Sequence, residues 1–551
     1  MTLEGNARSR LLPIVLLVLT LGSFFVNFWG WDLWAPDEPR YAEVARETLE
    51  DGHWLVPHLG GRAYADKPPL YFWLLAGSYA AFGMTPFAVR ILPVLSASAT
   101  ILVTYLLGRR LFNRRVALFA AIVLGTSVQF MDLGRHGNID ATLTLVTTAA
   151  IALLFLAHHE SRRGLWLPAY VLMALGPLMK GPVGFLVPML VFIVYLVVTG
   201  QAKGVRRMRL LPGLGILVVV VGAWLVPAAL EGGPDYTRTI LLRQNVGRAV
   251  ASFSHAKPLY YYLTSFPPNF LPWIVFLPQA VYLCVRRRTV QRLLPVVWFV
   301  TVFVFFSLMS GKRGLYLLPL FPAAALLVGV FFDACLGRTM PRRALSVPAV
   351  VLGVFLVALA GALCFLRRLV EVPDYLEAPA RLVWIAAVVL GAGGVALLGA
   401  VVAGRHAAVL PAVGITMLAL ASVMTLAIFP AMNANKTARF ICEDLLRART
   451  GSEPVVVYND ETRSGAYHFY TRLPLVDIAE EDELVERLRP GEKTYVILSE
   501  ENYTRLRPET TAGWQQVAAR RVGHRSMRVF VSGGVEIESE QQLKHTEEGP
   551  A

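Results

Sequence analysis

A cluster of acidic and basic residues directly follows the first apolar segment of the chain. It spans residues 31–41 (WDLWAPDEPRY) and contains Asp37 and Arg40. A second cluster, residues 66–69 (DKPP), places Lys67 just before another aromatic-rich stretch. A carboxylate can accept a proton or orient a nucleophile, and cationic side chains can stabilise a phosphate. Two such clusters around a short amphipathic run, residues 41–50, predict a functional site rather than a simple loop.

The composition is that of a membrane protein with several spans. Of 551 residues, 55% are hydrophobic and only 16% are charged, and the mean hydropathy is +0.53. These values exclude an ordinary soluble enzyme. The net charge of +14 comes largely from arginine clusters in alternate short loops, such as 109–115, 203–209 and 286–292. Such clusters are typical of cytoplasmic loops, so the charge predicts topology and no nucleic-acid partner.

Apolar segments of spanning length predict a polytopic α-helical fold with about thirteen transmembrane helices. They lie at 11–30, 86–107, 115–131, 140–157, 165–179, 181–199, 210–230, 268–285, 293–309, 315–333, 345–366, 381–402 and 407–429. The basic loops fall on one side if the N-terminus is cytoplasmic, and the odd count then places everything after Pro430 outside. The first segment is too long for a signal peptide and is expected to stay as an anchor.

This arrangement predicts two domains. Residues 1–430 form the transmembrane domain, with juxtamembrane helices in an outer segment at 32–85 and an outer loop at 231–267. Residues 431–551 form a small α/β domain, with strands expected at 454–458, 466–470, 494–498 and 527–531 and helices at 436–449 and 480–489. The four cysteines are scattered, so their spacing predicts neither a disulfide framework nor a zinc site.

Several polar residues share the outer face in this topology. Asp140, Lys180, Lys312 and Tyr316 all fall there, together with the segment that carries Lys67. An acid at a helix end is often a solvated cap, which stays an alternative for Asp140. Lys67 precedes two prolines that fix the backbone direction, so a role in a site is favoured over simple anchoring at the lipid headgroups.

The motif Trp-x-Pro-Asp-Glu-x-Arg-Tyr, followed about thirty residues later by Lys-Pro-Pro, resembles the GT-C superfamily of lipid-linked-sugar glycosyltransferases. The nearest branches are the bacterial aminoarabinose transferases that modify lipid A and the protein O-mannosyltransferases. The resemblance covers essentially the whole chain. It implies an enzyme that moves a sugar from a polyprenyl-phosphate donor to an acceptor on the outer face of the bacterial inner membrane.

The resemblance also implies roles for individual residues. Asp37 and Asp140 correspond to the two acids of the family pattern. The residues implied to contact the donor phosphate are Lys67, Arg40, Lys180, Arg248, Tyr316 and Lys312, and Glu38 and Asn245 are further site candidates. The family is expected to hold a divalent metal, zinc or another, near an acid that here is Asp66. The related branch carries a histidine where this chain has Asn245, so His255 is the alternative ligand and the predicted site is weak or absent.

The chemistry follows from the location of the reaction. Nucleotide sugars are cytoplasmic, so a donor used outside must arrive on a lipid carrier. Cationic side chains would stabilise the departing polyprenyl phosphate, and a single displacement would invert the anomeric centre. Lipid A, another envelope glycan and a protein all remain possible acceptors. A membrane transporter and a non-catalytic protein that binds lipid-linked glycans are the alternatives. Gly391, Gly393 and Gly394 lie inside a span and predict helix packing, not nucleotide binding.

Overall fold

The computed structural model describes residues 4–247, 256–369, 377–488 and 492–533. The chain forms two compact units. The first, here called the membrane unit, comprises Met1–Leu33 and Val44–Asn433. The second, the soluble unit, comprises Ala434–Ala551 together with the short N-terminal segment Trp34–Glu43. The residues of the first charged cluster are therefore divided between the two units.

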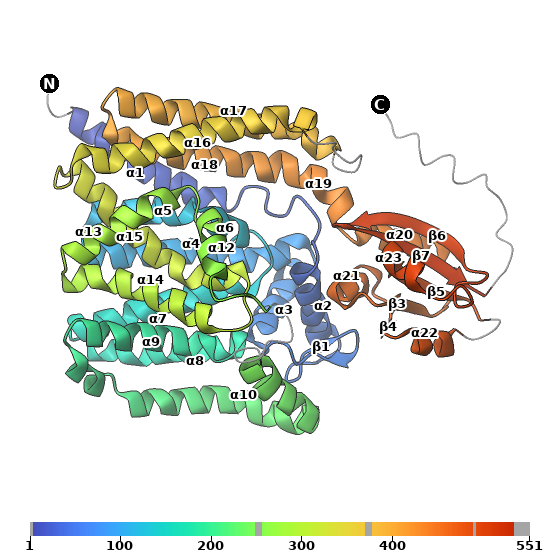
Figure 1. Ribbon diagram of the computed structural model, residues 1–551. Helices are drawn as coiled ribbons and strands as arrows, with labels where there is room; N and C mark the ends of the chain where they lie inside the picture. Colours follow the sequence, from blue (N-terminus) through green and yellow to red (C-terminus); the bar gives the residue numbers. More distant parts are fainter. Residues whose placement is uncertain (1–3, 248–255, 370–376, 489–491, 534–551) are drawn as a thin grey trace. The chain divides into compact units, whose positions relative to one another are not determined.

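The membrane unit is a bundle of helices (Figure 1). Its helices, in chain order, are α1 (Glu4–Ser23), α3 (Leu70–Phe82), α4 (Pro86–Leu111), α5 (Arg114–Gly125), α6 (Val128–Leu133), α7 (Ile139–His159), α8 (Trp166–Lys180), α9 (Val183–Val198), α10 (Leu210–Arg238), the π-helix η3 (Thr239–Gly247), α12 (Tyr261–Asn269), α13 (Leu277–Arg286), α14 (Val290–Leu308), the 3-10 helix η5 (Gly314–Leu320), α15 (Phe321–Leu336), α16 (Arg342–Leu369), α17 (Glu377–Val402), α18 (Val409–Val423) and α19 (Phe429–Lys436).

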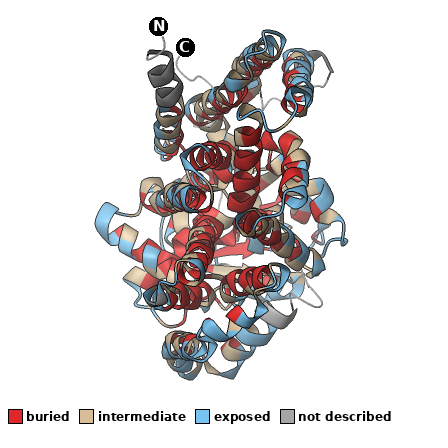
Figure 2. Ribbon diagram, turned by 90° about the vertical axis from the view of Figure 1, so that its left-hand side faces the viewer, coloured by how far each residue is buried: buried red, intermediate tan, exposed pale blue. Residues whose placement is uncertain are grey.

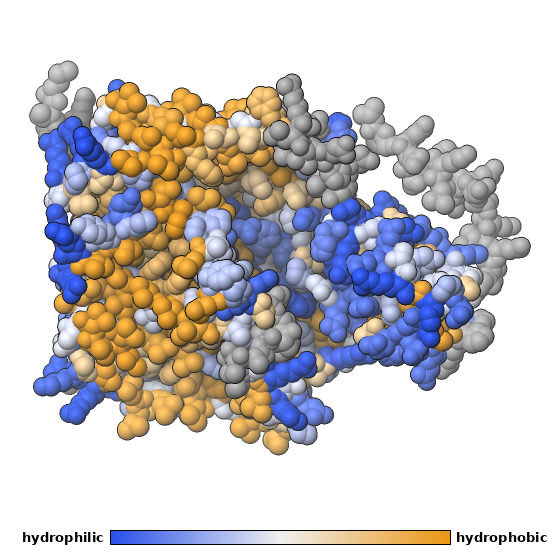
Figure 3. Space-filling model, in the orientation of Figure 1, coloured by the Kyte–Doolittle hydropathy of each residue, from blue (hydrophilic) through white to orange (hydrophobic). Residues whose placement is uncertain are grey.

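The prediction of a polytopic membrane protein is confirmed. Among the described residues, eight helices are long and apolar enough to cross a membrane, or nine if α12 and α13, which bend by 111°, form one broken span. Every one of the thirteen predicted segments overlaps a helix. Apolar atoms cover the surface of the bundle in Figure 3. Val351, Val354 and Phe355 of α16 are among the large apolar side chains that are exposed.

Small residues allow the helices of the bundle to pack closely. Figure 2 shows buried residues concentrated in the interior of the bundle. Helix α15 is almost fully buried and packs against α5. On α17, a Cβ atom at Gly394 would lie only 2.8 Å from the carbonyl oxygen of Gly353 on α16. A Cβ atom at Gly393 would lie 2.2 Å from the Thr416 hydroxyl on α18. The predicted packing role of this glycine cluster, Gly391, Gly393 and Gly394, is therefore confirmed.

The segment after the first span forms the juxtamembrane structure that the sequence predicted. Helix α2 (Asp37–Glu50) is followed by a two-stranded hairpin, β1 (His58–Leu59) and β2 (Arg62–Ala63), and then by α3. The buried carboxylate of Glu47 on α2 accepts hydrogen bonds from the backbone of Gly60, at 2.6 Å, and of Gly61, at 3.1 Å. Because the hairpin turn is hydrogen-bonded to α2, the backbone that leads into the DKPP cluster is held in place.

The soluble unit is a small α/β domain with a five-stranded sheet of order β4-β3-β5-β7-β6. Its elements are α20 (Arg439–Ala448), β3 (Val455–Tyr458), α21 (Glu461–Thr471), β4 (Leu475–Ile478), α22 (Glu481–Arg487), β5 (Thr494–Ser499), α23 (Glu500–Arg505), β6 (Gln515–Val522) and β7 (Arg525–Ser532). Strands β4, β3 and β5 are parallel, and β7 and β6 pair antiparallel. Apolar residues of β3 alternate between two cores, so both faces of the sheet are covered.

One predicted strand of this domain is wrong. Residues 466–470 are helical and belong to α21, although their aromatic residues favour a strand. The buried side chains Arg463, Tyr467 and Thr471 recur every four residues, which is the period of one helix face. Packing of this face against the sheet decides the conformation, and local propensity does not. Strands β4 and β6 were not predicted.

Candidate active site

Asp140 lies at the start of a buried helix in the membrane unit. It occupies the first turn of α7, where the side chain of Asn138 caps the helix by accepting hydrogen bonds from the backbone of Asp140 and Ala141 at 3.0 and 3.2 Å. The Asn138 amide also donates to the carbonyl oxygens of Leu133 and His136. The loop before α7 is therefore fixed, and the helix terminus favours a negative charge at Asp140.

Lys180 meets Asp140 from the neighbouring helix. It is the last residue of α8, and its ammonium group forms an ion pair with the Asp140 carboxylate. Both side chains are largely buried, with 15% and 8% of their surfaces exposed for Lys180 and Asp140. The same ammonium lies 4.5 Å from the centre of the Tyr316 ring. These three residues, predicted separately from distant parts of the chain, come together in one site.

Lys312 lies close to Tyr316 in the chain but makes a different contact. Its buried ammonium group donates to the carbonyl oxygen of Lys257 at 2.9 Å. A backbone bridge between Ala256 and Gly311 joins the same two segments. Lys312 therefore fixes the end of the outer loop 231–267 beside η5, the 3-10 helix that carries Tyr316.

The DKPP cluster is bonded to the outer loop as well. The carboxylate of Asp66 accepts a hydrogen bond from Gln244 on η3 at 2.5 Å. The ammonium of Lys67 donates to the carbonyl oxygen of Asp66 at 3.1 Å, and the following Pro68 and Pro69 are buried. Gln244 was not singled out from the sequence, although it directly precedes Asn245, which was.

The described residues around Asp66 do not make a complete metal site. No group of three or more histidine, cysteine, aspartate or glutamate side chains lies close enough to hold an ion within the described part of the chain. Zinc in proteins usually takes three or four such ligands. Of the other predicted residues, Asn245 lies on η3, whereas Arg248 and His255 lie outside the described residues.

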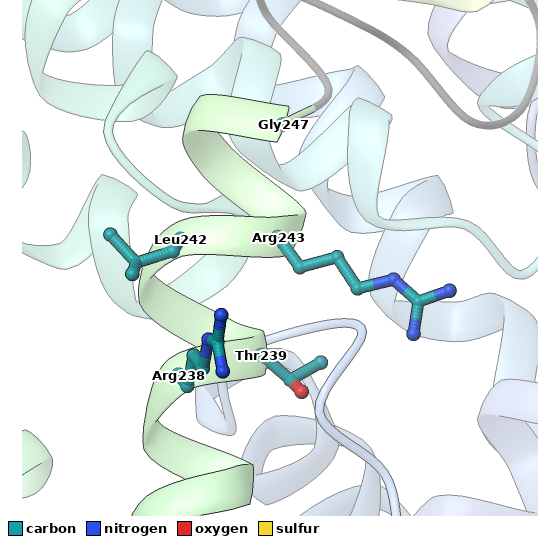
Figure 4. Close-up of a pocket in the computed structure, with 5 residues that line it drawn as sticks. All are labelled: Arg238, Thr239, Leu242, Arg243 and Gly247. Atoms are coloured by element: carbon teal, nitrogen blue, oxygen red, sulfur yellow. The ribbon is translucent and has the colours of Figure 1, made fainter.

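A cavity of about 590 Å³ opens beside η3. It is lined by Arg238, Thr239, Leu242, Arg243 and Gly247. Figure 4 shows Arg238 along the helix surface near Leu242, whereas Arg243 extends away from the helix. Two guanidinium groups, a hydroxyl and an apolar side chain suit an anionic group attached to a lipid. The sequence analysis did not single out this group.

The soluble unit contains the other predicted acid. Asp37 begins α2, and its carboxylate forms an ion pair with Arg40 one turn later, at 2.5 Å. The buried carboxylate of Glu38 accepts a hydrogen bond from the backbone of Trp34 at 3.0 Å. Glu38 therefore stabilises the turn that leads into α2.

Two buried arginines, which the sequence analysis did not single out, hold the chain before this turn. Arg90 on α4 is fully buried and donates to the carbonyl oxygens of Phe28, Trp31 and Asp32 at 3.1, 2.8 and 2.7 Å. Arg135 donates to the carbonyl oxygen of Ser23 at 2.9 Å, and burial lowers its pKa to about 10. A charged residue inside an apolar span is a signal that identifies Arg90 from sequence alone.

Comparison with known proteins agrees with this architecture. Residues 66–226 match the family described as dolichyl-phosphate-mannose-protein mannosyltransferase. The fold is similar to that of ArnT from Cupriavidus metallidurans, with a TM-score of 0.77 to the structure bound to undecaprenyl phosphate, 23% identity, and coverage of 94% of this chain and 97% of that one. Together with the sequence relatives described next, the fold and the matched segment define a membrane-embedded glycosyltransferase of the GT-C type.

Sequence relatives define the family more closely. The undecaprenyl phosphate-alpha-4-amino-4-deoxy-L-arabinose arabinosyl transferase 1 of Pseudomonas fluorescens is 30% identical over 388 residues, covering 68% of this chain and 69% of that one. The corresponding transferase of Pseudomonas aeruginosa is 32% identical over 391 residues, with the same coverage. The chain belongs to this family of arabinosyl transferases. A transporter and a non-catalytic binding protein, the alternatives from sequence, are therefore not supported.

Proposed function

We propose that the chain transfers 4-amino-4-deoxy-L-arabinose from undecaprenyl phosphate to a phosphate group of lipid A. The sugar and the carrier are those in the names of its relatives. The observation that carries the proposal is the position of Lys180, between the Asp140 carboxylate and the Tyr316 ring. A largely buried cation held in this way is oriented in advance toward a phosphate.

The proposed reaction is a single displacement. An oxygen of the acceptor attacks the anomeric carbon while the bond from that carbon to the carrier phosphate breaks, and the carrier leaves with the electron pair as undecaprenyl phosphate. Lys67, Arg40 and Lys180 stabilise the charge that develops on the carrier phosphate. Asp37 orients the acceptor. It takes the proton of a hydroxyl acceptor, whereas an ionised phosphate acceptor has no proton to lose.

The remaining predicted residues have supporting roles in this proposal. Asp140 holds Lys180, Tyr316 supports it from the other side, and Lys312 positions the outer loop. Arg248 and Asn245 are further contacts of the donor, as the family pattern implies. No step is assigned to a metal, and Asp66 with His255 stays the predicted weak site.

The cavity beside η3 suits the phosphate headgroup of the acceptor. Its arginines supply charge, and Leu242 and the neighbouring Leu241 are exposed apolar side chains that suit an acyl chain. Replacing Arg243 by glutamine should raise the KM for lipid A at least about fivefold and leave the KM for the donor unchanged. An equal change in both KM values would argue against an acceptor subsite.

The proposal places the active site outside the bacterial inner membrane. Residues 1–430 form thirteen spans with a cytoplasmic N-terminus, and residues 431–551 form a periplasmic domain. The alternation of arginine-rich loops supports this orientation. A phosphatase reporter fused after residue 440 should be active, and a reporter that fluoresces only in the cytoplasm should be dark. The opposite pattern would reverse the topology.

Mass spectrometry of lipid A from cells with and without the protein tests the function directly. The expected result is an added amino sugar only in cells that carry the protein. Asp37→Asn should remove this product without changing expression, because it removes the charge and keeps the shape. Asp51→Asn, a change of a more exposed acid fourteen residues later, is the matched control and should leave the product intact. Modification of another envelope glycan would show that the acceptor is wrong.

A further inference from the structure

The first turn of α2 belongs structurally to the soluble unit. Residues Trp34–Glu43 form a compact body with Ala434–Ala551, far away in the sequence. A backbone bridge pairs Trp34 antiparallel with Thr437, at the beginning of the soluble unit. The segment that carries Asp37 and Arg40 is therefore attached to this unit by backbone structure.

Gly465 makes the second contact between the segment and the soluble unit. It lies in the interior of α21, where glycine is unfavourable because it lowers helix stability. A Cβ atom at Gly465 would lie 2.8 Å from the Cα atom of Arg40 and 3.0 Å from its Cβ atom. Both distances are shorter than ordinary contacts between side chains and backbone. The missing side chain at this position thus allows α21 to lie directly against the backbone of Arg40.

Helix α21 is itself rigidly attached to the sheet. Asp460, just after β3, accepts hydrogen bonds from Arg463 and from the Tyr467 hydroxyl, both at 3.0 Å. All three side chains are buried. Asp460 directly precedes α21, and Arg463 and Tyr467 lie on the helix before and after Gly465. Movement of α21 would break this buried network, which is costly. The helix therefore offers a fixed surface to Arg40.

We infer that the soluble unit is a positioning element for the transfer reaction, and that Gly465 is the residue through which it sets the place of Asp37 and Arg40. The inference rests on the proposed function for the chemical roles of these two residues. It gives the soluble unit a part in catalysis through the segment 34–43 that belongs to it.

Substitution at Gly465 in the full-length protein tests the inference. Gly465→Ala adds one methyl group, and Gly465→Val adds three carbon atoms at the same place. We expect the transfer rate to fall in that order, by at least about tenfold for valine, because small displacements of reacting groups have large effects on rate. Thr462→Val, on the exposed side of α21, is the matched control and should keep the full rate.

Hydrogen exchange distinguishes positioning from unfolding. In Gly465→Val, residues 34–43 should exchange faster, while β3 and β5 keep their protection. If the sheet also loses protection in Gly465→Val, the same measurement on Gly465→Ala distinguishes positioning from unfolding. Helix propensity alone predicts that the alanine variant is at least as stable as the unchanged protein. A folded variant with unchanged exchange in residues 34–43 and a normal rate would overturn the inference. An active Asp37→Asn variant would instead refute the proposed role of Asp37, and the exchange result would be unaffected.

Discussion

Replacing Lys180 by methionine should destabilise the membrane unit strongly. The change keeps the length of the side chain but leaves the Asp140 carboxylate without its ammonium partner. Breaking a buried ion pair by removing one partner costs about 3–5 kcal/mol. The N-terminus of α7 still stabilises the Asp140 charge by about 0.3–1 kcal/mol, and part of the Lys180 surface is exposed. We therefore expect a loss near the lower limit, about 3 kcal/mol.

The double variant provides the control. Changing Asp140 to asparagine in the Lys180→Met background removes the unpaired charge, so most of the lost stability should return. Equilibrium unfolding of the purified protein in mixed micelles, followed by circular dichroism, measures both values. Transfer should be lost in both variants because the phosphate then lacks Lys180. A single variant within about 1 kcal/mol of the unchanged protein, or a double variant no more stable than the single one, would refute this account of the pair.

Further predictions concern Arg90, the use of the donor, the pH dependence of stability and metal binding. Arg90→Met leaves three buried carbonyl oxygens without their donor and should cost about 3 kcal/mol or more in unfolding free energy; an unchanged unfolding transition would contradict this. Lys67→Ala should lower kcat/KM for the donor, because about 2–4 kcal/mol of transition-state stabilisation is lost. Normal transfer by this variant would show that Lys67 only anchors the chain. Burial lowers the pKa of His58, so the unfolded chain binds the proton more readily. Its contribution to stability is therefore present above about pH 6.5 and lost as the pH falls below that value; His58→Asn should flatten the dependence of the unfolding midpoint on pH. Chelation should leave transfer unchanged, whereas stoichiometric zinc that is lost on His255→Ala would show a stronger metal site than predicted.

The sequence predicted the helical architecture well because its signals are local. Apolar segments of spanning length and alternating basic loops are each read within about 20 residues. The pairing of Asp140 with Lys180 is different, since forty residues separate them. It follows from the fold, because α7 and α8 are consecutive helices in contact, so the start of one lies beside the end of the other. Their separate roles were predicted, but their contact was not.

The contact of Gly465 could not be predicted because residues 466–470, which directly follow it, were assigned to a strand. Only the helix α21 brings Gly465 against Arg40. The sequence does indicate that Arg90 is special, because its charge lies four residues inside an apolar span. The groups that Arg90 binds could not be predicted, since backbone carbonyl oxygens have no sequence signature.

The pairing of residues 32–34 with residues 433–437 determines when the enzyme is complete during its synthesis. Asp32 exchanges hydrogen bonds with Asn433, which lies 401 residues later, and Trp34 pairs with Thr437. The ribosome makes the first of these partners early and the second only after the last apolar segment. A growing chain therefore inserts nearly all its helices before the segment with Asp37 has its partners. In the proposed topology the final domain must cross the membrane before these pairs form, so we expect an incompletely exported chain to be inactive.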